Sequence, residues 1–142
     1  MQKPRLGTAT PKIAWLAVTV GFLVDTMLSE FIATICRAVD PTVVGQADNS
    51  TFASTTGIVL WVASIFATGL GGYVAARWAK RERVLHGVLV GGLGIGMMLL
   101  FAVLDSSVTY NGLDLSLQFL ATLMGGVGGL LSSRLPTRQD DV

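Results

Sequence analysis

Two acidic residues, Asp25 and Glu30, interrupt a stretch from Ile13 to Cys36 that is otherwise largely apolar. A carboxylate deep in a membrane costs about 2.5–3.5 kcal/mol on insertion scales, so such residues usually face a bundle interior or a wet cavity. They often relay protons or bind cations. At 1.5 Å per residue, Asp25 lies roughly 18 Å beyond Ile13, near or just past the middle of a hydrocarbon core about 30 Å thick. We therefore expect Asp25 and Glu30 to be contacts for an ion, a proton or a partner chain.

The five-residue spacing places the two carboxylates about 140° apart around a helix, which does not favour a paired dyad. Asp25 shares its side with Ser29, whereas Glu30 shares its side with Arg37. In a helix that continues to Val39, the outer third leaves the hydrocarbon, and Glu30 and Arg37 reach the lipid headgroups. The alternative for Glu30 is therefore a simple interfacial position.

No other charged residue lies near the middle of a predicted span to pair with a charged Asp25. Its partner must come from another chain, from bound water, or from hydroxyls such as Ser64 and Thr68. The chain has one Cys, Cys36, and one His, His86, so a single chain assembles neither a disulfide nor a Cys/His metal centre. His86 is expected to be a polar interface residue near the start of the third helix. We expect no cofactor and no enzymatic activity, because few polar groups converge in the apolar segments.

The composition indicates an integral membrane protein. Of 142 residues, 51% are hydrophobic and 13% are charged, about half the charged share of ordinary soluble domains, with a net charge of +1. These values exclude a disordered chain, a nucleic-acid binder that works by bulk charge, and a typical soluble enzyme. Four apolar segments predict an all-α, four-helix transmembrane bundle, a single domain over residues 1–142. The predicted helices span about 11–39, 55–79, 84–104 and 114–133.

Proline and capping signals define the predicted helix ends. Thr10 followed by Pro11 predicts the start of the first helix, because proline is favoured at the first helical position. The pair Asp40-Pro41 predicts its end, because the residue before proline avoids the α region. Pro136 likewise predicts the end of the fourth helix.

Basic residues predict the orientation. Nine of the ten Lys and Arg lie at the N-terminus, between the second and third helices, or at the C-terminus, with Arg37 as the exception. This bias predicts that both termini are cytoplasmic. A basic cluster sets this topology and is a candidate contact for anionic lipid or a partner; its members are Arg77, Lys80, Arg81 and Arg83.

Glycine is abundant, with 17 residues, most of them in the last three predicted helices. Lipid provides little hydrophobic drive between helices, so small residues that allow close backbone approach carry the packing. Either these faces all meet within one bundle, or one is left for a partner or a second copy. The same glycines lie in apolar runs without a P-loop Lys-Ser/Thr, so nucleotide binding is not expected. The expected packing glycines are Gly71, Gly72, Gly87, Gly91, Gly92, Gly96, Gly125 and Gly129.

The run from Gly71 to Arg77 (GGYVAAR), followed by His86-Gly87 and Gly91, resembles a pattern in small four-helix bacterial inner-membrane proteins of uncharacterised function. In these proteins a Gly-Gly-Tyr/Phe-x-Ala-x-Arg run ends helix two. The resemblance implies a multi-pass protein of the bacterial inner membrane and implies no activity. A weaker similarity is to small multidrug-resistance transporters, which have four helices and a membrane carboxylate in helix one, but shorter loops and a weaker charge bias.

These observations predict a non-enzymatic integral membrane protein. The first expectation is an accessory or structural subunit that packs through glycine-rich faces, as a homo-oligomer or within a larger membrane complex. The alternative is a small proton- or cation-coupled transporter or channel that uses Asp25. The expected partners are the lipid bilayer and other membrane-protein chains, whether the same or different, and not nucleic acid.

Overall fold

The computed structural model describes residues 13–43, 54–79, 81–105 and 110–135, and all the regular structure within them is α-helical. The four helices are α1 (Trp15–Val39), α3 (Thr55–Ala79), α4 (Arg83–Leu104) and α5 (Gly112–Arg134). Each is long and apolar enough to cross a membrane. The described part of the chain is therefore an all-α, four-helix bundle with the character of a multi-pass membrane protein.

The start of α1 differs from the sequence prediction. The helix begins at Trp15, and Ile13 and Ala14 precede it in a non-helical conformation. The predicted start at Pro11 is therefore wrong, although Thr10 and Pro11 themselves lie outside the described residues. Ala14 takes the N-cap position instead.

The other helix ends follow local signals. α1 ends at Val39 with Asp40 as its C-cap, where the Asp40-Pro41 pair predicts it. α5 begins at Gly112, two positions before the predicted boundary, because Asn111 and Asp114 form a capping box. The Asn111 side chain accepts the N–H of Asp114 at 3.0 Å, and Asp114 accepts the N–H of Asn111 at 2.9 Å.

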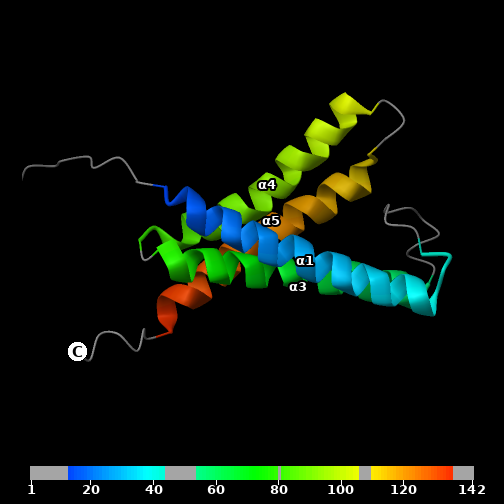
Figure 1. Cartoon of the computed structure of the whole chain (residues 1–142), viewed down its shortest axis with the longest axis horizontal. Helices are drawn as coiled ribbons and strands as arrows, with labels where there is room; N and C mark the ends of the chain where they lie inside the picture. Colours follow the sequence, from blue (N-terminus) through cyan, green and yellow to red (C-terminus); the bar gives the residue numbers. More distant parts are fainter. Residues whose placement is uncertain (1–12, 44–53, 80, 106–109, 136–142) are drawn as a thin grey trace, which may run out of the picture.

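The helices converge at one end and diverge at the other (Figure 1). α1 packs along α3, and both α3 and α4 pack on α5, whereas α1 meets α4 over a shorter length. Among the described residues, α1 and α5 have no Cα pair within 8 Å. The start of α1, the turn between α3 and α4 and the end of α5 share the converging end. At the opposite end, α4 and α5 lean away from α1 and α3 and open a fork.

Small residues explain why one end is tight. Val18, Ala75 and Val90 form a fully buried cluster there, and Phe22 packs against it. Larger apolar side chains point outward instead, including Leu16, Met27 and Phe31, which are 72%, 73% and 62% exposed. Such an arrangement suits a lipid solvent, in which apolar side chains face outward and small residues bring the backbones together.

A candidate cation site in the helix fork

A polar cleft of about 360 Å³ lies in the fork between the helix pairs. Residues of all four helices line it. Two other hollows among the described residues, both bordered by Phe66 and Leu70, are apolar. α1 and α3 contribute most of its polar side chains. The polar members are Asp25, Thr26, Ser29, Glu30, Trp61, Ser64, Thr68 and Gln118.

Asp25 is held by two hydroxyl groups. Thr68 Oγ1 on α3 donates to Asp25 Oδ1 at 3.0 Å, and Ser29 Oγ donates to the same oxygen at 3.4 Å. Thr68 is buried, and its Oγ1 also lies 3.2 Å from the carbonyl oxygen of Ser64. No hydrogen bond from another described residue reaches Asp25 Oδ2. One carboxylate oxygen is thus fixed and the other is left as an open acceptor.

Glu30 lines the same cleft one and a half turns further along α1. The sequence placed the two carboxylates on different faces, yet the cleft is wide enough to include both. Glu30 Oε2 lies 3.9 Å from Arg37 Nη1, and both side chains are well exposed, so this ion pair is weak. A smaller hollow of about 130 Å³ adjoins the cleft here and is lined by Glu30 and Arg37.

Sequence reasoning missed Gln118 and Trp61. Gln118 Nε2 donates to the carbonyl oxygen of Gly91 at 3.3 Å, and the amide lies directly against Gly94 on α4. This bond orients the carboxamide with its nitrogen toward α4, and no described residue donates to its Oε1. A carboxamide inside a predicted membrane span is a signal that could have identified Gln118.

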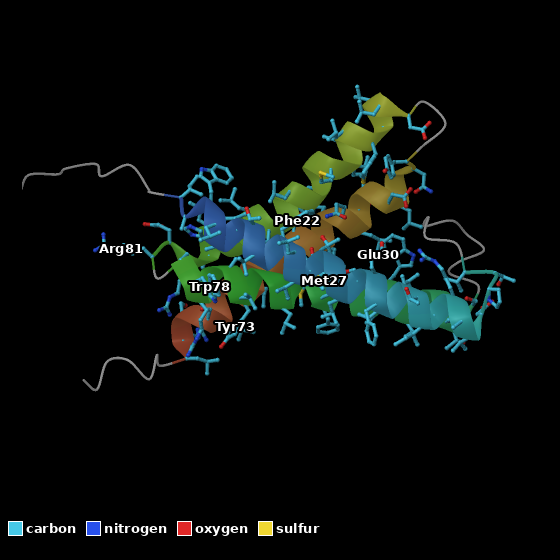
Figure 2. The ribbon with its side chains drawn as sticks, in the orientation of Figure 1. Phe22, Met27, Glu30, Tyr73, Trp78 and Arg81 are labelled. Atoms are coloured by element: carbon cyan, nitrogen blue, oxygen red, sulfur yellow. The ribbon has the colours of Figure 1, made fainter. Side chains whose placement is uncertain are left out.

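The cleft is closed toward the converging end. Phe22 forms its inner limit, and beyond Phe22 lies the buried cluster of Val18, Ala75 and Val90. Figure 2 shows Phe22 and Glu30 on the side of α1 that faces the fork. The cleft therefore reaches about half-way along the bundle. Apolar packing closes it on the side of the converging end.

Most of the candidate packing glycines lie where the helices are in close backbone contact, between the cleft and the converging end. A Cβ added to Gly71 would lie 2.5 Å from the oxygen of Gly21, and one added to Gly72 would lie 2.8 Å from the Cα of Gly125. Gly87 likewise meets Gly125 and Gly129 backbone to backbone. Here only hydrogen fits between the helices.

Close glycine contacts also join α4 to α5. A Cβ on Gly91 would collide with Thr122, and one on Gly129 would lie 2.6 Å from the oxygen of Arg83. Gly92 and Gly96 differ, because a Cβ on either meets no atom within 4 Å. These two glycines do not pack against another described part of this chain.

The described members of the predicted basic cluster lie in different surroundings, and their binding of lipid or a partner stays a prediction. Arg77 lies in the last turn of α3, Arg81 is exposed before the start of α4 (Figure 2), and Lys80 lies outside the described residues. Arg83 is bound to α5, where its Nη1 donates to the carbonyl oxygen of Ser132 at 2.6 Å. This bond ties the start of α4 to the last turn of α5.

His86 is not the polar interface residue that the sequence predicted, because it is completely buried. Its Nε2 accepts the N–H of Ala14 at 2.9 Å, and its Nδ1 lies 2.8 Å from the carbonyl oxygen of Glu82. Nδ1 must therefore carry the proton and Nε2 the lone pair, which is a neutral ring. The imidazole thereby links the N-cap residue of α1 to the first turn of α4.

Within the described residues, no group of three or more His, Cys, Asp and Glu side chains could hold a metal ion. The cleft instead offers isolated carboxylates with hydroxyl and amide neighbours. Comparisons with protein-family models, with curated proteins and with solved structures give no match. The resemblance of residues 71–91 to small bacterial inner-membrane proteins therefore stays a prediction.

Proposed function

We propose that this chain is a small proton- or cation-coupled transporter or channel that binds its ion at Asp25, in a bacterial inner membrane with both termini cytoplasmic. It carries out no covalent chemistry. The observation that carries the proposal is the fixed carboxylate: Thr68 and Ser29 hold one oxygen of Asp25 in a cleft built from all four helices. A carboxylate at such a position is costly unless it meets water, a proton or a cation.

The neighbours of Asp25 suit a small cation. With Oδ1 held by hydroxyls, Oδ2 is free to accept a proton or to coordinate an ion. The Ser64 hydroxyl and the Gln118 carboxamide line the same cleft and add neutral oxygen atoms. Hard cations prefer such oxygen ligands. Glu30 lies nearer the open end, where its charge raises the local concentration of cations.

The sealed end defines the conformational step that transport requires. An ion that reaches Asp25 from the fork meets Phe22 and the apolar cluster beyond it. Passage then needs this layer to separate or to become hydrated, as in a gate that opens by wetting. In the described conformation the cleft opens at the end of the bundle opposite the start of α1 and the end of α5 (Figure 1).

Flux across proteoliposomes tests this proposal. We expect the wild-type chain to carry a proton or monovalent-cation current down an imposed gradient, and Asp25→Asn to abolish it while the helical content is retained. Asp40→Asn is the matched control, because it makes the same chemical change outside the cleft. Equal flux through wild type and Asp25→Asn, or none above empty liposomes in the wild type, contradicts the proposal.

A second candidate function is an accessory subunit of a larger membrane complex or a homo-oligomer. Its support is the pair Gly92 and Gly96 on α4, which have open space where another helix could approach closely. Extraction in mild detergent, followed by native mass spectrometry, distinguishes the candidates. A particle containing other subunits supports the accessory role, and a particle of this chain alone, active in flux, supports the transporter.

A further inference from the structure

A long apolar groove of about 410 Å³ runs between α3 and α5, on a part of the surface separate from the Asp25 cleft. It exists because α3 and α5 meet through glycine: a Cβ on Gly128 would collide with Gly69 and lie 2.8 Å from the nitrogen of Tyr73. Because glycine has no side chain, a hollow remains at this contact, and larger apolar residues form its walls. These include Phe66, Leu70, Met124 and Leu131.

The groove is polar at one end only. Arg134, in the last turn of α5, lines that end together with Tyr73. Arg77 follows Tyr73 by four residues and so lies on the same side of α3. Among the described residues, neither guanidinium has a hydrogen-bond or ion-pair partner, whereas Arg83 nearby is bound to Ser132. Figure 2 shows Tyr73 near this end of the bundle, with Trp78 beyond it.

The length of the groove corresponds to one leaflet. From Met124 to Arg134 there are ten residues, which span about 15 Å along a helix, half of a hydrocarbon core about 30 Å thick. The groove therefore runs from the middle of the membrane to one surface. A transmembrane helix is about 10 Å wide and spans both leaflets, so it fits this half-length hollow poorly.

We propose that this groove is a binding site for an anionic phospholipid of the leaflet on the side of the termini. One acyl chain lies between α3 and α5, and the phosphate group lies between the guanidinium groups of Arg134 and Arg77. Arginine favours this role because its planar fork pairs with phosphate in a bidentate way. The site is independent of ion binding at Asp25.

Native mass spectrometry of the full-length protein tests the site, with phosphatidylglycerol and phosphatidylcholine as the two probes. We expect retention of one phosphatidylglycerol in preference to phosphatidylcholine. Arg134→Gln should weaken this retention about fivefold, as expected from about 1 kcal/mol per basic residue near a membrane surface. Val127→Trp, which fills the groove from its exposed edge and keeps both arginines, should weaken the binding of both lipids.

Arg81→Gln is the matched control, because it removes an exposed charge at the same end but outside the groove. If Arg81→Gln lowers retention as much as Arg134→Gln, the attraction comes from general surface charge and the proposal is wrong. Equal retention of the two lipids, or no effect of Val127→Trp, also overturns it. A cross-linked dimer formed through Val127→Cys would show that a second copy covers the groove, which contradicts the lipid site.

Discussion

Gly72→Ala tests whether close backbone contact holds the converging end together. The new methyl would lie 2.8 Å from the Cα and 2.9 Å from the carbonyl carbon of Gly125. The methyl would lie closer still to the carbonyl oxygen of Gly125. Ordinary contact begins at 3.4 Å, so α3 and α5 must separate by more than half an ångström, because backbone atoms cannot rotate away. Overpacking of this kind costs about 1–3 kcal/mol. The better helix propensity of alanine returns about 1 kcal/mol, so we expect a net loss of up to about 2 kcal/mol.

Gly92→Ala is the matched control, because its methyl meets open space on α4. It should leave stability unchanged or raise it by up to about 1 kcal/mol. Unfolding followed by helicity in mixed micelles, with rising mole fraction of denaturing detergent, measures both variants. Since the propensity terms cancel between them, the remaining difference is the cost of the clash. Equal unfolding midpoints for the two variants would refute the reasoning.

Three further substitutions probe separate contacts. Thr68→Val removes the hydroxyl that donates to Asp25, and we expect about tenfold lower ion flux with unchanged helicity, because the carboxylate is no longer held in place. His86→Phe keeps a ring but removes the acceptor for the Ala14 N–H, which should lower the free energy of unfolding by about 1–3 kcal/mol in the same micelle titration. Asn111→Ala removes the capping box of α5 and should cost about 1 kcal/mol, most visibly as faster amide hydrogen exchange in the first turn.

Hydropathy and helix-ending residues predicted the four helices because these signals are local. Asp40 and Pro41 mark the end of α1 through the backbone restriction that proline imposes on its neighbour. The start of α1 could not be predicted in this way. The Ala14 N–H, at the N-cap of α1, donates to His86, which lies 72 residues further along the chain. A tertiary contact is therefore made at this helix start, and the local signal at Pro11 did not predict it.

The candidate site was predictable only in part. A carboxylate within an apolar stretch identified Asp25, and the lack of any other charge near the middle of a predicted span suggested hydroxyl partners, of which Thr68 is one. The cleft itself depends on how far α4 and α5 lean away from α1 and α3 (Figure 1). The spacing of residues along the sequence does not determine the angle between helices. Gln118 joins the site only because of that arrangement.

The most direct measurement of the central claim is thiol accessibility inside the cleft. In a Cys36→Ala background, Ser29→Cys should react with a membrane-impermeant maleimide added on the side opposite the termini, because the cleft brings water to this position. Met27→Cys lies within about 3 Å of the same depth on the lipid-facing side and should stay unreacted. Labelling of Ser29→Cys alone is the predicted result. An inert Ser29→Cys, equal labelling of the two positions, or labelling only from the side of the termini would contradict a water-filled, one-sided cleft at Asp25.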